Sequence, residues 1–195
     1  MLNQSVKQVT IHLIEDDASQ RDSIESLLNF KGYMTKPYSK AKDFLKNANL
    51  ERPAIVISDI RLPDISGVEL HQALIEKDIN IPIIFISGEA TIQQSIDAMK
   101  QGAIEFLVKP FDIDELINAV TKAIRIELKE INLNVLLKNL SPREREVYKL
   151  LIEGFNNQEL LDKLHLSLPT VKQYKSEVMR KLKVNSLSKL IELAR

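Results

Sequence analysis

The sequence predicts an α/β domain with a doubly wound, five-stranded parallel sheet, followed by a helical linker and an all-α domain of four helices. Three observations carry this prediction. Five short apolar runs alternate with helical patterns over the first part of the chain, which favours a parallel sheet with right-handed crossovers. A long stretch with apolar residues at helical spacing then continues without Gly or Pro. Four helix-start signals follow in close order within residues 140–195.

The elements predicted for the first domain alternate regularly. Strands are expected near residues 8–15, 33–37, 54–59, 81–87 and 103–108, and helices near 18–30, 40–48, 66–77, 91–101 and from 113 onward. Gly32 and Gly102 stand where a helix would end in a left-handed cap. Pro53 and Pro82 precede buried strands at positions that tolerate a missing backbone N–H. The breaks in the pattern therefore agree with five strands and five helices.

The fifth helix is predicted to continue beyond the first domain. Apolar residues recur at helical spacing from Ile113 to Val135, and Pro142 is the first helix breaker after them. Two interpretations stay open: a short polar connector over residues 125–139, or a helical stalk that could pair in a dimer. We favour the stalk, since Ile131 and Val135 would otherwise be exposed apolar groups on a linker. We expect three segments, namely a first domain at 1–125, a linker at 126–139 and a second domain at 140–195.

Residues 140–195 contain four groups of residues that are typical of helix N-termini. The signals are Ser141 with Pro142 and Glu144, Asn156 with Glu159, Ser167, and Asn185 or Ser186. Four short helices in this space leave room for little but a compact bundle. The second and third, with a turn at 165–168, suit a helix-turn-helix.

Composition and charge narrow the class of protein. The chain has 195 residues, 44% of them hydrophobic, and no cysteine, so a disulfide framework and a thiolate metal site are excluded. Residues 1–7 are polar and no apolar run approaches membrane-span length, so we expect a cytoplasmic protein without membrane contact. Lys and Arg number 16 against 20 Asp and Glu in residues 1–139, but 11 against 7 in residues 140–195. A basic terminal module is compatible with nucleic-acid binding.

Acidic, hydroxyl and lysine side chains that together could bind a metal and a phosphoryl group stand at the ends of four of the predicted strands. They are the acidic pair Asp16 and Asp17, Asp59, Ser87 and Lys109. Ligands bind at the carboxyl ends of parallel strands, so these groups are expected to meet at one edge of the sheet. Grouped carboxylates repel one another unless a cation is present, and oxygen ligands with few residues suit Mg²⁺. We interpret Asp59 as a nucleophile that forms an aspartyl phosphate, with Lys109 and Ser87 contacting the phosphoryl group.

These residues resemble the CheY-like receiver domain of bacterial two-component response regulators. The likeness covers residues 1–125 and is carried by the four strand ends together with residues 59–70 (DIRLPDISGVEL) and 101–111 (QGAIEFLVKPF). It implies a partner histidine kinase, a metal contact from the backbone carbonyl of Arg61, a switch residue at Phe106 and a cis peptide before Pro110. Ser87 stands where threonine is commoner, and Phe106 lacks the hydroxyl of a tyrosine.

The third helix of the second domain has a polar outer face. Val171, Val178 and Leu182 lie along its inner stripe. The residues expected to contact DNA are Lys172, Gln173, Lys175, Ser176, Arg180 and Lys181, which combine groups for base edges with cations for phosphate. The alternative is an amphipathic helix with a solvated lysine face.

Four segments of this domain resemble the LuxR-type helix-turn-helix. They are residues 140–147 (LSPREREV), 153–160 (EGFNNQEL), 170–174 (TVKQY) and 178–182 (VMRKL). Joined to a receiver, the domain is similar to the NarL/FixJ family, closest to its FixJ side. Tyr174 replaces the histidine often found there, and Leu161 with Asp162 replaces the usual alanine and acidic residue. The resemblance therefore does not predict which operator sequence the domain recognises.

The resemblance implies a response regulator transcription factor and not an enzyme. Phosphorylation of Asp59 by a sensor histidine kinase would control dimerisation and sequence-specific binding to double-stranded DNA, with RNA polymerase as a further candidate partner. One alternative is a DNA-binding regulator that works without phosphorylation and keeps a relic receiver. Another is an Asp-nucleophile phosphatase of the haloacid dehalogenase type. That chemistry needs a second Asp as general acid, where this chain has Arg61.

Overall fold

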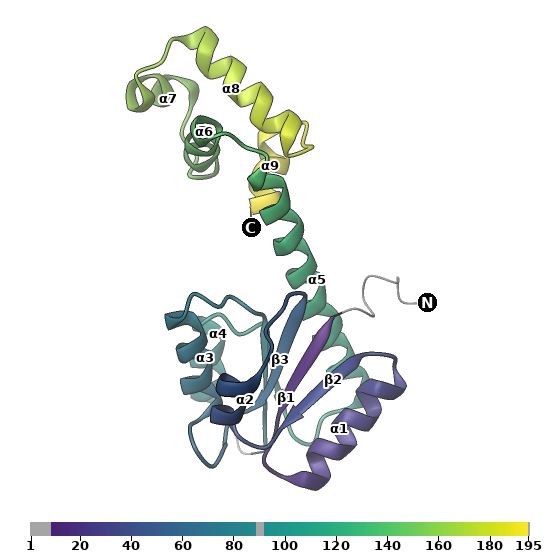
Figure 1. Ribbon diagram of the computed structural model, residues 1–195. Coiled ribbons are helices and arrows are strands. Elements are labelled where there is room, and N and C mark those ends of the chain that lie inside the picture. Colours follow the sequence, from purple (N-terminus) through teal and green to yellow (C-terminus); the bar gives the residue numbers. More distant parts are fainter. Residues whose placement is uncertain (1–8, 89–91, 195) are drawn as a thin grey trace. The chain divides into compact units, whose positions relative to one another are not determined.

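The structure is a computed structural model in which residues 9–88 and 92–194 are described (Figure 1). The chain divides into two compact units between Leu128 and Lys129. In the first unit a parallel sheet has the order β2-β1-β3-β4-β5. Its strands are β1 (Thr10–Ile14), β2 (Met34–Tyr38), β3 (Ala54–Asp59), β4 (Ile83–Ser87) and β5 (Glu105–Val108). The predicted doubly wound, five-stranded α/β fold is confirmed.

The helices around the sheet begin and end close to the predicted positions. They are α1 (Ala18–Phe30), α2 (Ala41–Asn47), α3 (Gly67–Glu76), α4 (Ile92–Lys100) and α5 (Ile113–Lys138). Gly32 and Gly102 have φ of 88° and 99°, as expected for left-handed caps. The predicted starts at residues 8 and 91, the polar segment 1–7 and the final residue 195 lie outside the described residues.

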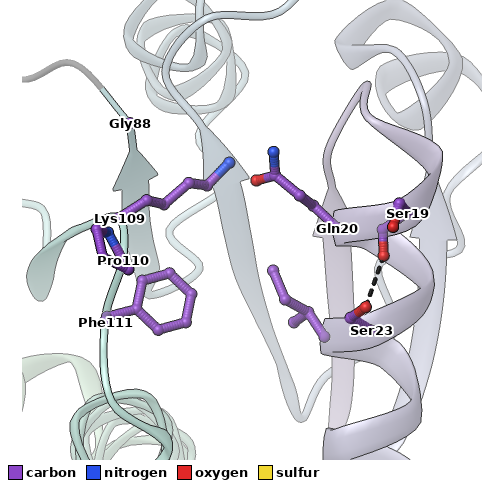
Figure 2. A pocket seen from close by; sticks show the side chains of 8 residues that line it. Ser19, Gln20, Ser23, Gly88, Lys109, Pro110 and Phe111 are labelled. Atoms are coloured by element: carbon purple, nitrogen blue, oxygen red, sulfur yellow. Dashed lines mark hydrogen bonds between the residues drawn. The ribbon is translucent and has the colours of Figure 1, made fainter.

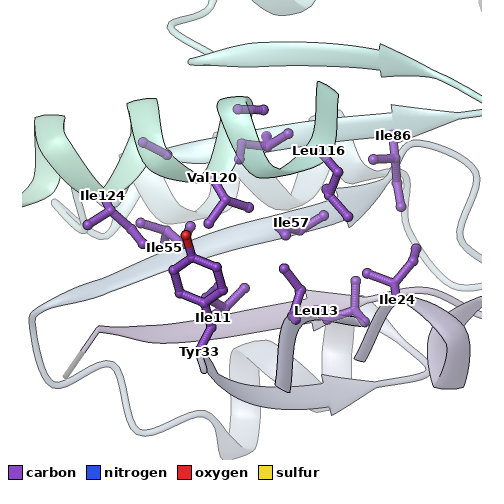
Figure 3. Close-up of a cluster of buried hydrophobic side chains, with 14 of the residues drawn as sticks. Ile11, Leu13, Ile24, Tyr33, Ile55, Ile57, Ile86, Leu116, Val120 and Ile124 are labelled. Carbon is purple, nitrogen blue, oxygen red and sulfur yellow. The ribbon is translucent and has the colours of Figure 1, made fainter. Parts of the chain in front are cut away.

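Alternate residues of each strand point to opposite faces, so the sheet has two separate cores. On one face Ile11, Ile55 and Ile57 pack with α1 and with Leu116 and Val120 of α5 (Figure 3). The other face carries a second apolar cluster that is covered by α2, α3 and α4, and its residues include Val56, Phe85, Phe44, Leu70 and Ala98. Burial on both faces explains why β3 and β4 have no exposed residue.

Two contacts fix the loop between β3 and α3. The backbone of Gly67 lies so close to the strand that a Cβ atom there would be 2.5 Å from the carbonyl oxygen of Asp59. A side chain at this position would push the start of α3 away from the end of β3. Further along the loop, the carboxylate of Asp64 accepts hydrogen bonds from the backbone N–H groups of Ala41 (3.2 Å) and Lys42 (2.8 Å). Asp64 thus caps the N-terminus of α2, where Lys40 makes no side-chain cap.

The helix α5 runs unbroken through the residues predicted as linker and ends at Lys138. Near the end of the first unit, the fully buried carboxylate of Glu127 accepts hydrogen bonds from Nε of Arg52 (2.9 Å) and from the backbone N–H of Ala54 (3.0 Å). Its second oxygen pairs with Nη2 of Arg52 at 2.5 Å. These contacts tie α5 to the start of β3. No helix in the described part of the chain is both long and apolar enough to span a membrane.

The second unit contains four helices after the end of α5. They are α6 (Pro142–Ile152), α7 (Asn157–Leu164), α8 (Leu168–Lys181) and α9 (Leu187–Ala194). The predicted capping boxes at Ser141 and Asn156 are both present, whereas Ser167 makes no side-chain cap to the backbone of α8. The apolar core joins Leu136 and Leu140 to Val147, Leu151, Leu160, Val171, Val178 and Leu190. The all-α helix-turn-helix arrangement is therefore as predicted.

Candidate functional site

Asp59 is the last residue of β3, and its carboxylate is held by two donors. The side chain is 9% exposed. Its Oδ1 accepts a hydrogen bond from the backbone N–H of Arg61 at 2.7 Å, and its Oδ2 lies 2.6 Å from Nζ of Lys109. The two contacts fix the carboxylate at the carboxyl end of the sheet, which is the edge predicted to bind ligands.

Lys109 joins Asp59 to a second carboxylate. Its Nζ lies 2.7 Å from Oε2 of Glu15 as well as 2.6 Å from Asp59. The peptide between Lys109 and Pro110 is cis, as expected. Burial by itself would lower the pKa of Lys109, but the hydrogen bonds to Asp59 and Glu15 and their negative charges raise it above its usual value. The lysine is therefore a fixed positive charge between two acids.

The acidic cluster differs from the expected one in one member. Carboxylate oxygens of Glu15, Asp16 and Asp59 lie within 4.8 Å of one another, whereas Asp17 caps α1 by accepting a hydrogen bond from the N–H of Gln20 at 2.8 Å. The expectation that Asp17 is a metal ligand is thus wrong, because its carboxylate already serves the helix start. Glu15, which sequence reasoning missed, takes its place.

Backbone contacts explain the shift by one residue. The N–H of Glu15 donates to the carbonyl oxygen of Tyr38, so the pairing of β1 with β2 extends one residue beyond the apolar run. Nη1 of Arg21 donates to the carbonyl oxygens of Glu15 and Asp16, which anchors the acidic segment to α1. Burial raises the pKa of Glu15, and its contact with Lys109 offsets part of that rise.

The cluster has the donor set of a divalent cation site. All three side chains offer oxygen, Glu15 and Asp59 are buried, and Asp16 is exposed, so one side is open to solvent. Hard oxygen ligands with room for water and a substrate oxygen are what Mg²⁺ takes in phosphoryl-transfer sites. The residues present therefore fit such an ion.

The other predicted site residues lie on the neighbouring strands and in the loop after Asp59. Ser87 ends β4 and is 1% exposed, and its carbonyl oxygen accepts a hydrogen bond from the N–H of Lys109 at 2.8 Å. Phe106 is half-buried in β5, directly opposite Phe85 in the strand register, and packs on the second apolar cluster. Arg61 is exposed in the loop after Asp59.

A cavity of about 500 Å³ opens beside Lys109, and sequence reasoning did not predict it. In Figure 2 Lys109, Pro110 and Phe111 face Gln20 and Ser23 of α1 across the cavity. Ser19, Ile24 and Gly88 complete its lining. A partner group could approach the end of Lys109 from this side.

The division of labour between the neighbouring acids can be tested by substitution. We expect Asp16→Ala to weaken Mg²⁺ binding at least about tenfold, since one oxygen ligand is removed. Asp17→Ala should leave Mg²⁺ binding nearly unchanged and should destabilise α1 by about 1 kcal/mol, because it removes a helix cap. Isothermal titration with Mg²⁺ and urea unfolding of both variants measure the two effects. Equal losses of Mg²⁺ affinity would contradict the assignment.

The outer face of α8 is the candidate DNA interface. Lys172, Gln173 and Ser176 are exposed, while Val171 and Val178 are buried in the core. The two faces of α8 are therefore arranged as predicted.

Three further residues of the expected set have partners within the protein. Nζ of Lys181 lies 2.7 Å from Oε2 of Glu144, whose side chain is 7% exposed, so Lys181 has an ion-pair partner within the same unit. The side chain of Arg180 is 68% exposed, and its guanidinium pairs with Glu177. Nζ of Lys175 lies 3.4 Å from Oδ1 of Asn157.

Comparison with known proteins gives matches in both units. Residues 11–121 match the family described as the response regulator receiver domain, and residues 138–194 match the LuxR family of bacterial regulatory proteins. Nodulation protein W of Bradyrhizobium diazoefficiens is 36% identical over 94% of this chain and 84% of its own length. Transcriptional regulatory protein FixJ of Rhizobium meliloti is 33% identical over 95% of this chain and 94% of its own.

A solved structure matches both units of the chain. The crystal structure of full-length FixJ from B. japonicum covers 96% of each chain at 34% identity, with a TM-score of 0.58.

Proposed function

The chain belongs to the two-component response regulators that join a receiver to a LuxR-type DNA-binding domain, and we propose that phosphorylation of Asp59 controls its binding to DNA. The single observation that carries the proposal is the contact of Lys109 with both Asp59 and Glu15 at the end of the sheet. The family is one of transcription regulators, and a receiver implies a histidine kinase as phosphoryl donor.

In the proposed reaction, an oxygen of Asp59 attacks the phosphorus of a phosphohistidine. The new P–O bond forms as the P–N bond breaks, and the histidine leaves with its electron pair. Lys109 stabilises negative charge on the phosphoryl oxygens, and the hydroxyl of Ser87 donates to one of them. A Mg²⁺ ion held by Glu15, Asp16 and Asp59, with the carbonyl oxygen of Arg61, would supply further charge neutralisation.

We propose that phosphorylation promotes a homodimer. The inward movement of Ser87 toward the phosphoryl group would draw Phe106 inward and change the surface of α4, β5 and the start of α5. Large apolar side chains on this surface are exposed: Ile96 and Met99 at 42%, and Val108 and Ile113 at 53%. Exposed apolar patches of this kind are typical of interaction surfaces. A dimer would carry two recognition helices to half-sites about one helical turn apart.

The experiment for this proposal uses acetyl phosphate and Mg²⁺ as a small phosphoryl donor. We expect one phosphate per chain on a Phos-tag gel, a shift toward dimers in sedimentation, and an increase in DNA affinity of about 5- to 150-fold, the usual range of coupling between two sites. A chain that takes up no phosphate, or a phosphorylated chain with unchanged DNA affinity, would favour the regulator with a relic receiver.

Substitutions on the outer face of α8 should have two different effects on DNA binding, depending on whether the residue contacts a base edge or a phosphate. Replacing Lys172 or Gln173 with Ala is expected to reduce the preference for specific over non-specific DNA by about 1–3 kcal/mol for each base edge that the variant can no longer bind. Replacing Arg180 should weaken binding to all DNA sequences alike. If Arg180 neutralises one phosphate, the slope of the logarithm of the binding constant against the logarithm of the salt concentration (the salt slope) should fall in magnitude by about one. Binding assays over a range of salt separate the two effects. An unchanged preference in both Lys172→Ala and Gln173→Ala would contradict base recognition by α8.

The same proposal includes the cellular setting. A response regulator takes its phosphoryl group from the kinase domain inside the cell and acts on DNA there, so we infer a cytoplasmic location. RNA polymerase is the proposed further partner, because a bound regulator changes transcription through contact with the polymerase or through exclusion of it.

A further inference from the structure

A basic groove lies in the second unit between the end of α5 and α6. Its volume is about 450 Å³, and its lining consists of Asn134, Leu137, Lys138, Arg145, Tyr148 and Lys149. Three of the six side chains are cationic and none is acidic. We propose that this basic groove binds an acidic segment of a partner protein, with one apolar side chain of that segment against Leu137 and Tyr148.

Arg145 is held in place before any partner binds. Its Nε donates to the carbonyl oxygen of Leu140 at 3.2 Å, and its Nη2 donates to the carbonyl oxygen of Lys138 at 3.4 Å. These bonds use two of the five N–H groups of the guanidinium. The remaining donors keep a defined direction at little further entropic cost, which favours bidentate binding of a carboxylate.

The base of the basic groove is apolar and is formed by side chains that pack in the core of the second unit. Tyr148 is 6% exposed and packs in the core with Val147 and Leu151. Leu137 is partly buried against the same core. Tyr and Arg are enriched at protein interfaces because they combine contact area with directed hydrogen bonds. A segment with only negative charge would leave the apolar base uncovered, so the expected ligand has an apolar residue among its acids.

The basic groove and the candidate DNA contacts belong to different helices. The inner side of α8, with Val171 and Val178, packs into the same core as Val147 and Leu151 of α6. Lys172 and Gln173 project from the opposite side of α8 and are exposed. A duplex bound by that outer side would leave the groove on α6 open. This separation, together with the lining charge, favours an acidic protein segment over a second stretch of DNA.

The test uses the full chain and a fluorescein-labelled peptide rich in glutamate with one leucine. Because each contact is an exposed charge pair, Lys138→Ala and Lys149→Ala should each weaken peptide binding about two- to fivefold in fluorescence anisotropy. Lys149→Glu should weaken it about tenfold or more, because a like charge then faces the peptide. The matched control is Lys172→Ala, which removes the same charge from α8 and should leave the peptide affinity unchanged. A peptide with glutamine in place of glutamate should not bind.

Two measurements could overturn the proposal. Equal weakening by Lys149→Ala and Lys172→Ala would mean that the peptide follows overall charge and has no defined site. If Lys149→Ala instead lowers the salt slope for a mixed-sequence duplex by about one, the groove contacts DNA phosphate. Retained peptide binding in the presence of saturating duplex is the expected result, and its loss would place both ligands on one surface.

Discussion

Asp59→Asn is expected to abolish phosphorylation of the chain. The amide has no nucleophilic oxygen of comparable strength, and the replacement also removes one of the two acids that contact Lys109. Incubation with acetyl phosphate and Mg²⁺, followed by a Phos-tag gel, should give no shifted band. The effect is the largest expected for the receiver, because no partial activity remains when the accepting atom is removed.

Two control variants make this result specific. Asp64→Asn changes another acid of the same loop outside the acidic cluster, and it should be labelled at the normal rate because asparagine keeps one of the two acceptor oxygens that cap α2. Glu15→Gln keeps the nucleophile and removes a carboxylate, so labelling should be slower and still reach one phosphate per chain. Labelling of Asp59→Asn at the rate of the unaltered chain would remove Asp59 from the proposed role.

Glu144→Ala is expected to destabilise the second unit by about 1–3 kcal/mol, because it removes charged hydrogen bonds to Lys181 and one half of the capping box at Ser141. Glu144 receives two hydrogen bonds from Nζ of Lys181, at 2.8 and 2.7 Å, and one from the N–H of Ser141 at 2.7 Å. It thereby joins the start of α6 to the end of α8. The destabilisation should appear as faster hydrogen exchange in α6 and α8, with β3 and β4 unchanged.

Glu146→Ala is the matched control for Glu144→Ala. Glu146 lies on the same helix and pairs with Arg143 in an exposed position. Its removal should change the free energy of unfolding by less than about 1 kcal/mol. Similar exchange rates in the two variants would show that the internal ion pair contributes little to the stability of the unit.

The same carboxylate makes stability depend on pH. The hydrogen bonds from Lys181 hold the pKa of Glu144 below its usual value, despite the opposing effect of burial. A depressed folded-state pKa contributes stability above the unfolded value of about 4.3, and this contribution is lost as the pH falls through the folded value. Acidification below about pH 4 should therefore lower the protection factors of amides in α6 and α8 of the unaltered chain, after correction for the slower intrinsic exchange in acid, and Glu144→Ala should lack this component.

The sequence predicted the fold well because local signals and burial agree. Strands such as β3 are buried on both faces and read as continuous apolar runs, and Ser141 and Asn156 stand where caps are required. The boundaries of α1 match the prediction because Asp17 has the chemistry of an N-cap. Agreement of hydrophobic pattern with cap chemistry is what makes such elements predictable.

The contacts that the sequence did not predict have a common physical reason. Three acids stand in a row from Glu15 to Asp17, and the sequence does not show which two of them reach the cluster. The hydrogen bond from Glu15 to Tyr38 and the cap that Asp17 makes on α1 decide it. Lys181 has the spacing of an outer-face cation, but its partner Glu144 lies 37 residues away in the chain. Contacts between distant residues leave no trace in local periodicity, so the structure was needed to find them.

The cap that Asp64 places on α2 limits which segments can be exchanged between receiver domains in a chimera. The loop that follows Asp59 is an attractive segment for grafting, since it borders the site and is short. Its Asp64 also satisfies two backbone N–H groups that belong to a helix 22 or more residues earlier in the chain. A transplanted loop without that carboxylate would leave α2 uncapped, at a cost of about 0.5–2 kcal/mol. A chimera should therefore exchange the loop and the start of α2 together, as one cassette.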